Sequence, residues 1–148
     1  MKKQILYSVA KLELIKHLNN LILNYFPNIQ AIYLFGSYGT EEEWSDSDID
    51  IALLLPHEEA KQIPSLYLHP LHSHLTSYFN KPVDLINLRQ VNVVLRKEVI
   101  MAERLIYCGD KYAVDEFEML TISFYLKLNE ERKAILEEFF QTKRAYNV

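Results

Sequence analysis

Two short apolar segments, separated by a polar stretch that begins with a glycine, constrain this chain more than any other feature. The first segment, Ala31–Phe35, ends directly at Gly36. The second, residues 48–55, opens with alternating aspartates and continues as an apolar run. Short apolar runs bounded by turn-forming residues are typical of buried strands. We therefore expect two strands of one sheet, with a tight turn after the first and an acidic start to the second.

The rest of the chain alternates between helical and strand patterns. Apolar residues recur every three or four positions in the segments expected to be helical, and short apolar runs mark the strands. This order of elements favours an α/β (α+β) layer structure with helices packed on a small sheet. We expect helices at residues 8–26, 57–79 (in pieces), 91–102 and 114–141, and further strands at residues 82–88 and 104–108.

Size, charge and cysteine content limit the possible functions. The 148 residues suit a single domain, and the formal net charge is −4. A long nucleic acid is not expected as a partner, because the cationic residues are scattered and form no basic face. The single cysteine, Cys108, fits a reducing compartment. Since no run of about 18 apolar residues occurs, we expect a cytoplasmic protein that does not enter a membrane.

The aspartates at the start of the second strand form a candidate metal site. Side chains alternate along a strand, so Asp48 and Asp50 should share one face while Ile49 and Ile51 enter the core. Two adjacent carboxylates repel each other unless a cation neutralises them. Mg²⁺ is suited to this role, because its protein sites often supply only one or two carboxylates and leave the rest to phosphates and water.

The turn after the first strand is a candidate phosphate site. Gly36 lets backbone N–H groups approach a phosphate closely, and the hydroxyl of Ser37 adds one donor. The segment that follows is expected to be a loop, with a possible helical turn at residues 41–44. That loop should return the chain so that the aspartates and the turn face the same pocket.

The pattern Gly36-Ser37, ten residues, then Asp48-x-Asp50 resembles the signature of the polymerase-β-like nucleotidyltransferase superfamily. Short chains of this kind are called minimal nucleotidyltransferases, or MNT proteins. The resemblance implies a small mixed sheet flanked by helices, with a catalytic core at about residues 28–110 and a long C-terminal helix. It also implies a third carboxylate from a later strand, where Asp84 is the only acidic residue.

By this resemblance the catalytic and metal-binding residues are Asp48, Asp50 and Asp84, and the nucleotide-binding residues are Gly36 and Ser37. The implied metal is Mg²⁺, as two ions that Mn²⁺ can replace, and the implied substrate is ATP. One departure is Glu41, which stands where many relatives have a further glycine.

The same resemblance implies a partner. The chain looks like the MntA-like antitoxins, which transfer AMP from ATP to a tyrosine of a HEPN-family toxin, a helical RNase, and so silence it. Two alternatives remain open. The first is an enzyme that nucleotidylates a small molecule such as an aminoglycoside. The second is a non-catalytic MNT antitoxin that acts only by binding.

Other patterns favour simpler interpretations. An EF-hand loop beginning at Asp46 is excluded, because Ile51 and His57 stand where that loop needs Gly and Glu. The nearby histidines 69, 72 and 74 are expected to be structural rather than ligands. The apolar stripes of the first and last helices are expected to belong to the core. The last helix also carries more aromatic residues than a domain of this size needs, so a surface for a partner protein on this helix is an open alternative. These residues are Tyr125, Phe139, Phe140 and Tyr146.

Overall fold

A four-stranded mixed sheet forms the centre of the protein. The computed structural model describes residues 9–38 and 48–146. The strands are β1 (Ala31–Phe35), β2 (Ile49–Leu54), β3 (Val83–Asn87) and β4 (Leu105–Cys108), in the spatial order β3-β2-β1-β4. Strand β1 is antiparallel to both β2 and β4, whereas β2 and β3 are parallel.

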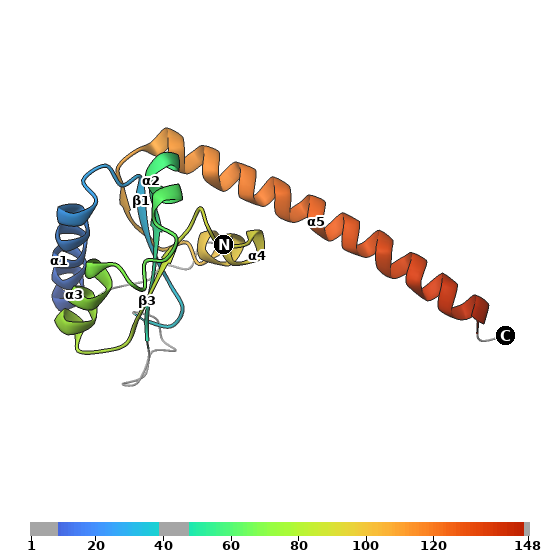
Figure 1. Ribbon diagram of the computed structural model, residues 1–148, viewed down its shortest axis with the longest axis horizontal. Coiled ribbons are helices and arrows are strands. Elements are labelled where there is room, and N and C mark those ends of the chain that lie inside the picture. Colours follow the sequence, from blue (N-terminus) through green and yellow to red (C-terminus); the bar gives the residue numbers. More distant parts are fainter. Residues whose placement is uncertain (1–8, 39–47, 147–148) are drawn as a thin grey trace.

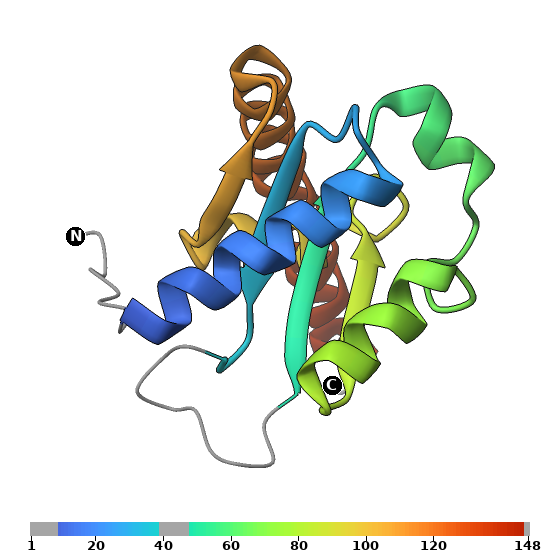
Figure 2. The ribbon, with the colours of Figure 1, turned by 90° about the vertical axis from the view of Figure 1, so that its left-hand side faces the viewer.

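Helices cover both faces of this sheet. Figure 1 shows α1 (Val9–Tyr25) and α3 (Pro70–Phe79) on one side, with α4 (Val93–Met101) and the start of α5 (Lys111–Tyr146) on the other. The view in Figure 2 looks onto the side covered by α1 and α3. A short helix, α2 (His57–Gln62), and α3 lie in the crossover that a parallel pair such as β2 and β3 requires.

Alternation along the strands divides the core into two clusters. In β2, Ile49, Ile51 and Leu53 are buried in the cluster on the side of α1 and α3, while Ala52 and Leu54 are buried in the cluster on the other side. Apart from Asp50 at the start of β2, the central strands β1 and β2 carry almost only apolar side chains, because both faces of the sheet are covered. The second cluster is completed by α4, which contributes Val99, and by the first turns of α5, which contribute Val114 and Phe117.

Local signals account for the helix ends near the site. Helix α3 begins with Pro70 at its first turn and is capped by His69, whose ring accepts a hydrogen bond from the N–H of Leu71. It ends at Asn80, which adopts a left-handed conformation at φ 51°. The side chain of Asn92 caps α4 by accepting from the N–H of Leu95 at 2.9 Å. These ends fix where β3 and α4 start.

The fold class and the order of elements predicted from the sequence are confirmed, with boundaries that shift by a few residues. One expectation about packing is wrong. Only the first turns of α5 belong to the core, and from residue 129 to residue 143 every side chain is exposed. Figure 1 shows this part of α5 running away from the sheet. Among the helices that the structure describes, none is long and apolar enough to cross a membrane.

Candidate active site

Two predicted carboxylates lie side by side at one end of the sheet. Asp50 of β2 is in register with Asp84 of the parallel strand β3. Their side chains share one face, and neighbouring strands lie about 4.8 Å apart. Asp48 precedes β2 and is exposed, whereas Ile49 and Ile51 are fully buried. The expectation that the isoleucines point into the core is confirmed. Strand alternation places Asp48 on the face of Asp50.

The carboxylate of Asp50 is in an unfavourable environment for a negative charge. Its pKa is raised to about 6, first by partial burial and then by the charges of Asp84 and Asp48. The guanidinium of Arg104 lowers that pKa but does not cancel the increase. Repulsion among carboxylates at a common site is the condition that a bound cation relieves.

The glycine before the loop is required by the same carboxylate. Gly36 has φ +70°, a conformation that favours glycine. A Cβ at this position would overlap Oδ2 of Asp50. The contact arises because β1 ends at Phe35, which pairs with Asp50 in the antiparallel register. The turn after β1 is therefore packed directly against the acidic start of β2.

Positive side chains gather around the turn that carries Ser37, which is half-buried. The Nζ atoms of Lys11 and Lys81 lie 4.9 Å and 5.8 Å from the ring centroid of Tyr38, which is buried. One lysine comes from α1 and the other from the segment before β3. Two cations beside this turn provide a positive environment suited to a polyphosphate. Sequence reasoning missed both lysines.

Arg104 holds this turn in place. Its side chain is buried and donates hydrogen bonds to the carbonyl of Gly36, at 2.9 Å, and to the carbonyl of Tyr38. Its own carbonyl accepts from the N–H of Leu34 at 3.0 Å, which joins the arginine to β1. The sequence analysis did not identify this role for Arg104. Its partners are 66 and 68 residues away in the sequence, so no local pattern could reveal this role.

The carboxylates at this site can hold a divalent ion only when a substrate supplies further oxygen ligands. Within residues 9–38 and 48–146, no three acidic, histidine or cysteine side chains are close enough to hold a metal ion by themselves. The adjacent pair Asp50 and Asp84 supplies two hard oxygen ligand groups. This suits a Mg²⁺ site in which substrate phosphates and water complete the coordination. It does not suit a closed structural metal site.

The three neighbouring histidines have structural roles, as expected. His69 caps α3 and its pKa is lowered by burial. His72 donates from Nε2 to the carbonyl of Val83 at 2.8 Å, and His74 is hydrogen-bonded to the hydroxyl of Tyr25 at 3.1 Å. Each ring has a different hydrogen-bond partner, and the three histidines are not among any group of side chains in the described residues that could hold a metal ion.

Several features of the predicted loop lie outside the described residues. These are the helical turn expected at residues 41–44, the departure at Glu41 and the acidic positions that follow it.

Comparison with known proteins gives a family and a relative. Residues 16–112 match the model of the family described as "Polymerase beta, Nucleotidyltransferase". The chain is also similar to the protein adenylyltransferase MntA of Shewanella oneidensis. The two are 34% identical over 118 residues, which cover 80% of this chain and 81% of that protein.

Solved structures show the same arrangement of elements. A toxin–antitoxin complex with AMP-PNP contains a chain that is 30% identical, with a TM-score of 0.64, and the match covers 85% of this chain and 98% of that one. A second solved structure is the complex of a tri-AMPylated HEPN toxin of Shewanella oneidensis with an MNT antitoxin. One chain of that complex is 30% identical to this chain, with a TM-score of 0.61. That match covers 87% of this chain and 98% of the other.

Proposed function

This chain belongs to the polymerase β nucleotidyltransferase family, and we propose that it transfers AMP from ATP to a tyrosine of a HEPN-family toxin and thereby neutralises that toxin. The observation that carries the proposal is the in-register pair Asp50 and Asp84, packed against the turn at Gly36. The relatives support the choice of acceptor. One is named protein adenylyltransferase MntA, and a neighbouring structure holds an AMPylated HEPN toxin with its antitoxin.

The metal site of this proposal consists of Asp48, Asp50 and Asp84. Family membership and the structure with an ATP analogue imply a divalent metal and ATP as substrate. We take the metal to be Mg²⁺, as two ions that Mn²⁺ can replace. When bound together with ATP, it would neutralise the developing charge and lower the pKa of the attacking hydroxyl.

The remaining residues bind and orient the substrates. In the transfer, the tyrosine hydroxyl oxygen attacks the α-phosphorus of ATP. The bond between that phosphorus and the oxygen bridging the α- and β-phosphates breaks, and pyrophosphate leaves. The backbone at Gly36 and the hydroxyl of Ser37 donate to the phosphates, and Lys11 and Lys81 add positive charge. Asp84 is exposed and adjoins Asp50, so it is placed to accept the hydroxyl proton.

We also infer that residues 1–148 act as one minimal nucleotidyltransferase domain. In the described residues, the sheet and its helices form one body from which only α5 extends. In this arrangement the acceptor tyrosine is brought to the aspartates by a second protein.

A direct test mixes the purified chain with a HEPN-family toxin of the same organism, ATP and Mg²⁺. Intact-mass spectrometry should show the toxin gaining the mass of whole AMP groups, and peptide mapping should place them on tyrosine. Chelation of the metal should prevent the gain. An unlabelled toxin that is nevertheless inhibited would replace this proposal with the binding-only alternative. Labelling of an aminoglycoside with the toxin unmodified would replace it with the small-molecule alternative.

Replacement of Ser37 with Ala should slow transfer at least roughly tenfold. The change removes one hydrogen bond to a charged acceptor, worth about 1.5–3 kcal/mol, while the neighbouring backbone donors stay in place. The measurement is the initial rate of AMP transfer at saturating toxin. Because Ser37 is proposed to position phosphates, a covalent nucleotide on its hydroxyl in the wild type would contradict this role.

A further inference from the structure

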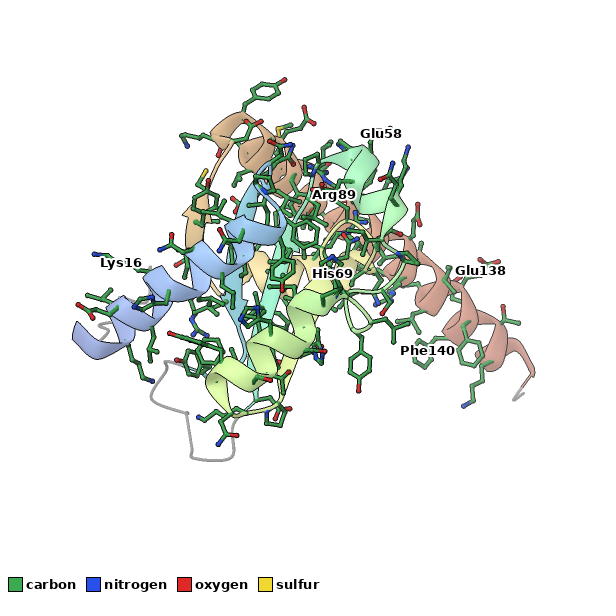
Figure 3. All side chains as sticks on the ribbon, turned by 60° about the vertical axis from the view of Figure 1, so that its left-hand side comes forward. Lys16, Glu58, His69, Arg89, Glu138 and Phe140 are labelled. Carbon is green, nitrogen blue, oxygen red and sulfur yellow. The ribbon has the colours of Figure 1, made fainter. Side chains whose placement is uncertain are left out.

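A pocket with two arginines lies at the end of the sheet opposite the carboxylates. Arg89 follows β3 and donates from Nε to the carbonyl of Leu55, at 2.6 Å, and from Nη2 to Oε1 of Gln30, at 2.5 Å. Arg96 of α4 donates from Nη2 to the carbonyl of Arg89 at 2.5 Å. Both guanidiniums lie over the ring of Phe117 in α5, at 5.6 Å and 5.8 Å from its centroid. Figure 3 labels Arg89 in this region, between the sheet and α5.

The charges in this arginine pocket are not balanced. The cavity has a volume of about 270 Å³, and its lining includes Arg89, Arg96, His57 and a single carboxylate, Glu116. Neither guanidinium forms an ion pair with any carboxylate that the structure describes, and Nε of Arg96 is buried without a hydrogen-bond partner there. Burial lowers the pKa of both arginines. The charge of Arg96 lowers the pKa of Arg89 further, and the single carboxylate Glu116 opposes this decrease without cancelling it. A carboxylate brought from outside would correct this imbalance.

The other wall of the pocket is apolar and continues along α5. Its residues Leu120 and Phe124 are 43% and 56% exposed. They belong to one face of the helix, which we call the α5 stripe and define as Phe117, Leu120, Phe124, Leu128, Ile135 and Phe139. A helix of this length gains most of its stability from packing, yet beyond residue 128 the described side chains of α5 are all exposed. Figure 3 shows Glu138 and Phe140 on this outer part of the helix, away from the sheet.

We propose that the α5 stripe and the arginine pocket together bind a helix of the acceptor protein, with an acidic side chain of that helix inserted between the two arginines and α5. This inference rests on the proposed function, because it assigns the surface that holds the toxin. Phe117 is buried against α4 at the inner end of the stripe, and the exposed part from Leu120 to Phe139 is about 29 Å long at 1.5 Å per residue. An apolar stripe of this length is suited to helix-on-helix packing. The unbalanced pocket selects a partner helix that carries a carboxylate.

The position of this surface favours the acceptor protein over a second copy of the chain. The stripe begins at Phe117, which packs against α4, so it faces the side of the sheet that α4 covers. Asp50 alternates with Ile49 and Ile51, so it points to that same side, and Asp84 is in register with it. A protein held on the α5 stripe is therefore on the correct side of the sheet to present a tyrosine to the carboxylates.

The test compares two exposed positions of α5 that lie on opposite faces. Phe124 belongs to the stripe and Leu126 does not, and they are 56% and 57% exposed. Binding of the purified HEPN-family toxin is measured by calorimetry for the wild type, Phe124→Glu, Leu126→Glu and Arg96→Gln. Phe124→Glu should weaken binding roughly a hundredfold, because a charge enters an apolar interface. Arg96→Gln should weaken it roughly tenfold through the lost charged contact, and Leu126→Glu should bind as the wild type does. Thermal melting of each variant identifies any that fail to fold.

The outcomes separate this inference from the proposed function. Wild-type affinity and wild-type AMP transfer in Phe124→Glu would overturn the docking surface and leave the enzyme activity standing. Tight binding of the toxin without any AMP transfer, with the expected losses in the variants, would support the surface and overturn the activity. A wild-type chain that sediments as a dimer and becomes monomeric in Phe124→Glu would assign the stripe to a second copy. Stabilisation by inorganic phosphate that Arg96→Gln abolishes, with toxin affinity unchanged, would assign the pocket to a small anion.

Discussion

Asp50→Asn is expected to reduce AMP transfer to the toxin by roughly a thousandfold or more, the scale on which the loss of a preorganised electrostatic group acts. Asp50 occupies the centre of the proposed site, in register with Asp84 and packed beneath Gly36. The asparagine has nearly the same shape, so the change removes a charge and leaves the packing intact. The rate is measured with labelled ATP at saturating toxin.

Two companion variants make this result specific. Asp84→Asn should also fail in transfer but should bind Mg-ATP nearly as the wild type does, because Asp50 and the phosphate turn remain. Asp48→Asn and Asp50→Asn should each lose AMP transfer and Mg-ATP binding. All three should still bind the toxin, since the proposed docking surface is elsewhere. Wild-type transfer by Asp84→Asn would show that this residue is not the third carboxylate, and transfer by all three variants would refute the nucleotidyltransferase activity.

The same substitution should stabilise the metal-free protein. The pKa of Asp50 is raised from 3.8 to about 6, so the folded state binds its proton more tightly than the unfolded state does. The contribution of Asp50 to the free energy of unfolding therefore falls as the pH rises from about 4 to about 6, and stays lower above that range. Asp50→Asn lacks this titration and should gain on the order of 1 kcal/mol at pH 7, after allowance for solvent screening of a half-exposed group. Urea melts in the presence of a chelator, at pH 4 and pH 7, measure both effects.

The strands, and the placement of Asp50 on the face opposite Ile51, could be predicted because their signals are local. The apolar run Ala31–Phe35 has the length of a strand and ends at a glycine, and the structure places β1 at those residues. Alternation along β2 predicted correctly that Asp50 and Ile51 point in opposite directions. Register between β2 and β3 was not predictable in this way, because it depends on how the crossover through α2 and α3 packs.

The features that sequence reasoning missed depend on contacts between distant segments. Arg104 supports the turn after β1 from a position more than 60 residues away. Lys11 reaches Tyr38 only because α1 packs across the sheet near that turn. The error on α5 has a different origin. A periodic apolar stripe shows which face of a helix avoids water, but it does not show whether the chain itself or another protein covers that face.

Gly36→Ala is expected to lower AMP transfer by roughly a hundredfold or more, although it removes no functional group. A Cβ at φ +70° costs about 1–2 kcal/mol in backbone strain, and here it would also overlap Oδ2 of Asp50. The carboxylate and the phosphate turn must therefore move apart, and a displacement of about 1 Å at a reacting centre can lower a rate roughly a hundredfold. Gly109→Ala is the matched control, because a Cβ there would crowd the carbonyl of Ile29, far from the aspartates. Both variants should melt at lower temperature than the wild type, but at a temperature where both are folded only Gly36→Ala should lose transfer. Equal losses in the two variants would mean that reduced stability, and not the contact between Gly36 and Asp50, limits the activity.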